Sequence, residues 1–285
     1  MVDFGVMIFP TDKAIGPIEL AKEAEARGFE SLWFPEHSHI PTSRVTPWGG
    51  REGAPPLPEE YWRSHDQFVA LGAAAAVTER IKLGTGITLV AQRDPIWLAK
   101  SVATVDALSG GRMLFGIGYG WNKEEMNHHG VSYTQRRAVT REAILAMKEL
   151  WTKDEAEFHG EHFSFSPSWQ WPKPTQKPHP PVILGGAAGP RTIADIVEFC
   201  DGFMPVAGRY DFASQVKDVQ RAAEDAGRDP ASITFGQFGT PPKADIVEGL
   251  IEAGCTRIVL GLPPAGPAEV LPLLDRHAEL VSSFA

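Results

Sequence analysis

Residues 81–117 read IKLGTGITLVAQRDPIWLAKSVATVDALSGGRMLFGI and contain one complete strand–helix–strand unit. The apolar runs 81–90 and 112–117 are typical of strands that are buried on both faces of a parallel sheet. Between them, 94–109 has helical periodicity and begins at Asp94-Pro95, a favoured start for a helix. The order strand, helix, strand therefore predicts a parallel βαβ unit.

The same unit recurs along the whole chain. The predicted strands are 4–9, 31–35, 81–90, 112–117, 181–184, 202–206, 232–237 and 257–261. The predicted helices lie near 17–28, 66–79, 94–109, 134–151, 190–200, 210–227, 242–254 and 266–280. Strict alternation predicts a single (β/α)₈ TIM barrel, an α/β fold, over residues 1–285. A doubly wound open sheet is the alternative.

Two long insertions interrupt the short loops of this pattern, near 37–65 and 152–180. The first follows a strand, on the barrel side where loops carry function, so we expect it to cover a ligand. The second insertion precedes the strand at 181–184 and so approaches it from the opposite end of the barrel. We expect Trp169 and Trp171 to pack against the protein at that end.

Composition excludes several classes of protein. With 27 basic and 36 acidic residues the formal charge is −9, which disfavours nucleic acid as a partner. Cys200 and Cys255 are the only cysteines, which fits a reducing cytosol. The chain begins without a signal-like segment and has no apolar stretch of membrane-spanning length. We therefore expect a cytoplasmic protein that does not interact with membranes.

The ends of the predicted strands offer few reactive side chains. Glu36 and His37 follow the second strand, and His37-x-His39 lacks the further ligands that a catalytic metal requires. Glycoside hydrolysis needs two carboxylates, but the strand ends offer only Glu36. Schiff-base chemistry needs a Lys, and none stands at a strand end. We therefore expect a cofactor to carry the chemistry. Gly185-Gly186-Ala187 precedes a helix, where backbone N–H groups and Arg191 are suited to hold a phosphate, unless the turn serves packing alone.

Several long motifs resemble the bacterial luciferase-like family, and its coenzyme F420-dependent branch in particular. They are Gly84-Thr85-Gly86-Ile87, the stretch 106–112, Gly116–Glu125 and Pro178–Gly186. The resemblance implies a deazaflavin in the barrel mouth, a small-molecule substrate and a homodimer. It also implies a strand bulge at Gly86-Ile87 flanked by Thr85, often with a non-prolyl cis peptide. Cofactor contacts are implied at Gly118, Gly120, Asn122 and the loop Gly185-Gly186-Ala187.

The chain departs from the F420 branch at two positions. Glu36 stands where Asp is common, and Trp121 stands where sugar-phosphate dehydrogenases have a catalytic Glu. Trp121 would instead form an aromatic wall suited to an apolar or aromatic substrate. The expected mechanism has His37 exchanging a proton with the substrate while Glu36 orients its ring. An FMN-dependent monooxygenase of the same family and a barrel that only binds a ligand are the alternatives.

Overall fold

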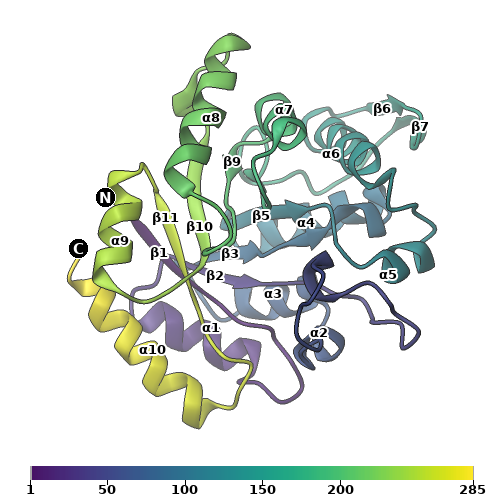
Figure 1. The fold of residues 1–285 in the computed structure, drawn as a ribbon. Helices are drawn as coiled ribbons and strands as arrows, with labels where there is room; N and C mark the ends of the chain where they lie inside the picture. Colours follow the sequence, from purple (N-terminus) through teal and green to yellow (C-terminus); the bar gives the residue numbers. More distant parts are fainter. Residues whose placement is uncertain (1, 285) are drawn as a thin grey trace.

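The structure is a computed structural model that describes residues 2–284, and its centre is one closed parallel sheet (Figure 1). The strands are β1 Asp3–Met7, β2 Ser31–Phe34, β3 Lys82–Thr85, β4 Thr88–Leu89, β5 Met113–Gly118, β8 Val182–Leu184, β9 Gly202–Phe203, β10 Thr234–Thr240 and β11 Arg257–Gly261. Their order is β3-β2-β1-β11-β10-β9-β8-β5-β4, and a further β3–β5 pairing closes the ring. The predicted strand 81–90 is divided into β3 and β4, which together fill one of eight barrel positions. The (β/α)₈ barrel is thus confirmed, and the open-sheet alternative was wrong.

Eight helices surround the sheet, and each begins within two residues of its predicted start. They are α1 Pro17–Ala26, α3 Gln67–Ala75, α4 Pro95–Leu108, α6 Arg136–Thr152, α7 Pro190–Phe199, α8 Phe212–Asp225, α9 Ala244–Glu252 and α10 Pro267–Ser282. Their starts follow from local chemistry, since proline occupies the first turn of α1, α4, α7 and α10. Asp94 caps α4 by accepting a hydrogen bond from the Trp97 N–H at 2.9 Å.

Large side chains fill the interior of the barrel. Trp33 meets Phe238 edge to face, with 6.2 Å between ring centroids, and its indole N–H donates to the Ser31 hydroxyl at 2.8 Å. Gly84 makes room for the indole, because a Cβ there would lie 2.2 Å from Trp33 Cε3. A larger apolar cluster lies between the strands and the helices. The barrel is therefore a packed core, and chemistry is restricted to its mouth.

The insertions form smaller elements. The first holds a 3₁₀ turn at Trp48–Gly50 and α2 at Glu60–Arg63. The second contains the antiparallel hairpin of β6 Ala156–His159 and β7 Ser164–Ser168. Further 3₁₀ turns lie at Val90–Gln92 and Pro230–Ser232, and α5 spans Lys123–His128.

The packing expected for the second insertion was wrong, because Trp169 and Trp171 are 79% and 58% exposed. The segment is held through its backbone and its amide side chain instead. Lys100 Nζ donates to the Trp171 carbonyl, and Gln170 Nε2 donates to the Ile96 carbonyl at 3.1 Å. Both indoles therefore face outward beside α4. Within residues 2–284, no helix combines the length and the apolar character needed to cross a membrane.

Candidate active site

His37 follows β2 at the mouth of the barrel and is paired with a buried carboxylate. Its side chain is only 6% exposed, and its Nδ1 lies 2.7 Å from Oε2 of Glu125 in α5. Glu125 Oε1 accepts a hydrogen bond from the Ser38 N–H at 3.0 Å. Burial alone raises the pKa of Glu125, but the hydrogen bonds from His37 and Ser38 outweigh it and lower the pKa overall. Glu125 is therefore a carboxylate, and sequence reasoning missed it.

Glu36 does not orient the His37 ring, so the role that we expected of Glu36 was wrong. The Glu36 carboxylate accepts hydrogen bonds from the Leu89 N–H at 2.7 Å and from Arg93 Nε at 2.6 Å. Arg93 also forms an ion pair with Asp66 at 3.2 Å, so it is not a free surface charge. Glu36 and His37, although adjacent in the sequence, therefore bind separate partners.

Aromatic side chains from two segments lie beside the His37 ring. Ring centroids of Tyr61 and Trp121 lie 5.0 and 5.7 Å from that of His37, and Trp48 lies 5.9 Å from Tyr61. Tyr61 and Trp48 belong to the first insertion, which thus packs against the predicted catalytic histidine. Sequence reasoning identified Trp121 but not Tyr61 or Trp48, since their loop has no regular pattern from which to place them.

The break between β3 and β4 brings five of the predicted cofactor residues together, namely Thr85, Gly86, Ile87, Gly118 and Gly185. The Gly86-Ile87 peptide is cis, as predicted. A Cβ on Gly118 would lie 2.1 Å from Ile87 Cδ1, and a Cβ on Gly185 would lie 3.1 Å from Ile87 Cγ2. These two glycines therefore make room for the Ile87 side chain. Thr85 is fully buried and donates its hydroxyl hydrogen to the Gly116 carbonyl at 2.7 Å.

Two other predicted contacts lie after β5. Gly120 has a φ of 77°, a left-handed conformation that favours glycine. Asn122 is fully buried and caps α5, where its Oδ1 accepts from the Glu125 N–H at 3.3 Å. Its Nδ2 has no hydrogen-bond partner among the described residues. Any contact between Asn122 and a cofactor remains a prediction.

The loop Gly185-Gly186-Ala187 leads into α7, as the sequence predicts. Gly186 is exposed, and nothing lies within 4 Å of a Cβ built there. Gly189 is the N-cap of α7 and has no side chain to satisfy the first N–H groups of the helix. Arg191 is exposed in the first turn. This donor set suits an anion.

Arg137 of α6 adds a second cation at this helix terminus, and sequence reasoning missed it. Its Nη2 donates to the Thr192 hydroxyl at 3.0 Å, and its guanidinium lies 3.9 Å above the Tyr119 ring. Arg137 also forms an ion pair with Asp195 at 3.4 Å, and Asp195 accepts a hydrogen bond from the Tyr119 hydroxyl. These contacts fix Arg137 beside the first turn of α7.

Three further histidines extend from the His37–Glu125 pair toward the surface. His39 Nε2 lies 2.8 Å from His128 Nδ1, and the Ser38 hydroxyl lies 2.7 Å from His129 Nε2. Burial lowers the pKa of His129. No group of three or more potential ligands within residues 2–284 has an arrangement suited to a metal ion.

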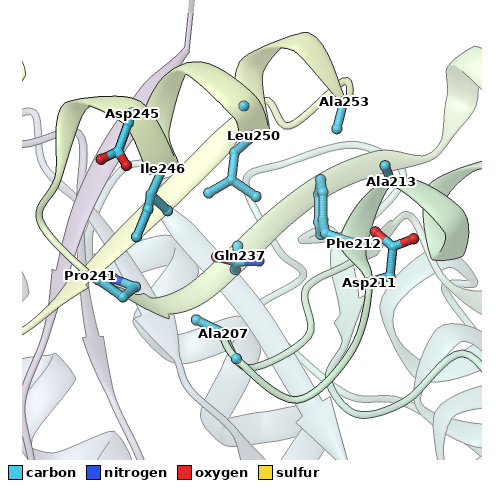
Figure 2. Close-up of a pocket in the computed structure, with 12 residues that line it drawn as sticks. Ala207, Asp211, Phe212, Ala213, Gln237, Pro241, Asp245, Ile246, Leu250 and Ala253 are labelled. Atoms are coloured by element: carbon cyan, nitrogen blue, oxygen red, sulfur yellow. The ribbon is translucent and has the colours of Figure 1, made fainter.

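A separate groove of about 380 Å³ lies between α8 and α9 (Figure 2). Phe212, Ile246 and Leu250 form apolar parts of its lining, and Gln237 of β10 also lines it. None of the predicted site residues lines this groove. The predicted residues lie instead at the barrel mouth and on the loop that leads into α7.

Comparisons with known proteins identify the family of the chain. The family model described as luciferase-like monooxygenase matches residues 14–245. An uncharacterized protein of Mycobacterium tuberculosis is 39% identical over 279 residues, covering 96% of this chain and 97% of that protein. The FMNH₂-dependent dimethylsulfone monooxygenase of Pseudomonas putida is 34% identical over 127 residues, covering 44% of this chain and 35% of that protein.

A solved structure shows the same fold over the whole chain. The coenzyme F420-dependent tetrahydromethanopterin reductase of Methanopyrus kandleri has a TM-score of 0.77 and 21% identity, covering 100% of this chain and 99% of that one. One fold neighbour is therefore named for F420 and one sequence relative for FMNH₂. Because the family model covers most of the barrel, including the break between β3 and β4 and the loop before α7, the chain belongs to the luciferase-like monooxygenase family.

Proposed function

We propose that the protein is a coenzyme F420-dependent oxidoreductase that exchanges hydride with a small apolar or aromatic substrate. The observation that carries this proposal is the pairing of His37 with buried Glu125 at the barrel mouth, and the Ile87 side chain occupies the space that a side chain on Gly185 would need. A histidine placed for proton transfer, next to a loop suited to an anion, fits an enzyme whose cofactor performs the redox step. The sequence resemblance to the F420 branch supports the choice of cofactor.

The residues present fit the anionic tail of such a cofactor. The uncapped N-terminus of α7, the open space at Gly186 and the cations Arg137 and Arg191 would hold its phosphate. Ile87, supported by Gly118 and Gly185, would lie against the ring system. When bound, the deazaflavin supplies the centre that accepts or donates hydride.

His37 would exchange the proton that accompanies hydride transfer. Its Nδ1 is occupied by Glu125, and its Nε2 has no hydrogen-bond partner in the described part of the chain. We infer that Nε2 binds the substrate oxygen. Tyr61 and Trp121 beside the ring favour an apolar or aromatic substrate and limit access of water.

An FMN-dependent monooxygenase is the second candidate. It is supported by the description of the matching family and by the FMNH₂-dependent relative, which matches 44% of this chain. The same loop and helix terminus would then hold the phosphate of FMN.

Cofactor retention separates these candidates. The apoprotein is mixed with F420 or with FMN, passed over a desalting column and examined by visible absorption. We expect F420 to be retained. Retention of FMN alone would favour the monooxygenase, and retention of neither would favour a barrel that does not use these cofactors.

A charge reversal tests where the cofactor tail lies. Arg191→Glu should weaken retention because it places a carboxylate beside the expected phosphate. Arg221→Glu is the matched control, because it makes the same charge change at an exposed position of α8. Equal retention by both variants would place the phosphate elsewhere.

A further inference from the structure

We propose that Glu125 is the positioning residue of His37, which holds the imidazole proton on Nδ1 and leaves Nε2 free to accept a proton from the substrate. This inference rests on the proposed role of His37 and names a residue that the resemblance does not assign. The protonation pattern of the ring follows from the partners of each Glu125 oxygen.

The Ser38 backbone N–H fixes the orientation of the Glu125 carboxylate, because it can donate a hydrogen bond but cannot accept one. The Ser38 backbone N–H lies 3.0 Å from Oε1, and the Ser38 hydroxyl lies 3.3 Å from the same oxygen. Because a backbone N–H has no acceptor function, Oε1 must accept. The Glu125 side chain is 0% exposed, so solvent does not compete for either oxygen.

The second oxygen then determines the tautomer of His37. Oε2 lies 2.7 Å from Nδ1, and an ionised carboxylate accepts hydrogen bonds only. Nδ1 must therefore carry a hydrogen. A neutral imidazole has one N–H, so its Nε2 presents a lone pair. The lowered pKa of Glu125 supports the ionised form.

Within residues 2–284, no other side chain lies within hydrogen-bonding distance of His37 Nδ1. Glu36 is bound to Leu89 and Arg93. His39 and His129 contact the Ser38 hydroxyl, at 2.9 and 2.7 Å, and so help to hold Ser38 rather than His37. Among the described residues, Glu125 is the one whose carboxylate binds both the His37 ring and the Ser38 backbone.

The Glu125→Gln variant tests the proposal because the site dictates which way its amide must face. The Ser38 N–H still requires an acceptor, so the amide oxygen must remain on that side. The amide NH₂ then faces Nδ1 and donates to it, which converts Nδ1 into an acceptor and moves the His37 proton to Nε2. The variant should therefore reverse the tautomer with almost no change in side-chain shape.

The reversal is measured by ¹⁵N NMR of histidine-labelled protein without cofactor at pH 8, with the His37 signals assigned by their loss in His37→Ala. We expect a protonated Nδ1 in the parent and a protonated Nε2 in Glu125→Gln. Turnover of the loaded enzyme should fall roughly a thousandfold or more, as when the orienting Asp of a Ser-His-Asp triad becomes Asn.

Glu124→Gln is the matched control. Glu124 Oε1 accepts from the Val45 and Thr46 N–H groups, both at 3.1 Å, so it fastens the same insertion to α5 without contacting His37. This variant should keep the parent tautomer and a turnover within a few-fold of the parent. Glu125→Asp retains an acceptor-only carboxylate and should also keep Nδ1 protonated, which provides a second test if the glutamine variant folds poorly.

The outcomes separate this inference from the proposed function. An unchanged tautomer in folded Glu125→Gln, or a protonated Nε2 in Glu125→Asp, would overturn the positioning role. A reversed tautomer with unchanged turnover would leave the positioning role standing and would refute the proton-transfer role of His37.

Discussion

Gly86 packs closely against Phe238, so a larger residue at position 86 should lower the stability of the fold. A Cβ built on Gly86 would lie 2.4 Å from Phe238 Cζ and 2.6 Å from Cε2, well inside the closest approach of real Cβ atoms. Phe238 belongs to the interior cluster with Trp33, Leu114, Ile183, Met204 and Val259, so its ring has little room to move. Relief of the contact requires a shift of about 1 Å, and such overpacking costs about 1–3 kcal/mol.

Gly86→Ala should therefore lower the free energy of unfolding by about 1–3 kcal/mol, measured by urea denaturation. Shortening the neighbour in the double variant Gly86→Ala/Phe238→Leu should recover part of this loss relative to Phe238→Leu alone, since the two positions share one space. Gly249→Ala is the control: nothing lies within 4 Å of its Cβ, and alanine in a helix interior stabilises by up to about 1 kcal/mol. Additive effects of Gly86→Ala and Phe238→Leu would refute the packing argument.

Three further predictions concern catalysis, pH and assembly. His37→Ala should leave cofactor retention within a few-fold while turnover falls roughly a hundredfold or more, and a joint loss of both would show that the ring holds the loop instead. Burial raises the pKa of Glu30, but hydrogen bonds from Arg257 and Lys82 lower it to about 2, against 4.5 for the free side chain. Glu30 should thus stabilise the fold above about pH 4.5 and lose this contribution as the pH falls toward 2, so Glu30→Gln should flatten the decline of the urea midpoint between pH 5 and pH 3. Val69, Trp97 and Leu108 on α3 and α4 are 73%, 73% and 69% exposed, so we expect a homodimer through this face. Trp97→Glu should give a monomer by light scattering, whereas Val45→Glu should not.

The strand and helix pattern was predictable because each element is determined by local chemistry. Apolar runs bounded by turns identified the strands, and proline or Asp94 marked where helices begin. The division of 81–90 at the cis Gly86-Ile87 peptide came only from the family resemblance, since the run itself has no apparent break. The exposure of Trp169 and Trp171 was not predictable, because their segment is anchored through backbone carbonyls and an amide side chain.

The site was only partly predictable because its central contact joins residues 88 positions apart. Asn122-x-x-Glu125 has the spacing of a capping box, in which the acid at the third helical position returns to the N-cap backbone. Asn122 does cap α5, but Glu125 binds His37 and Ser38 instead. If the predicted strand 31–35 is extended through residues 36 and 37, adjacent side chains there point to opposite sides, which disfavours Glu36 as the partner of His37. This alternation would not have identified Glu125, because that contact depends on how the first insertion folds over α5.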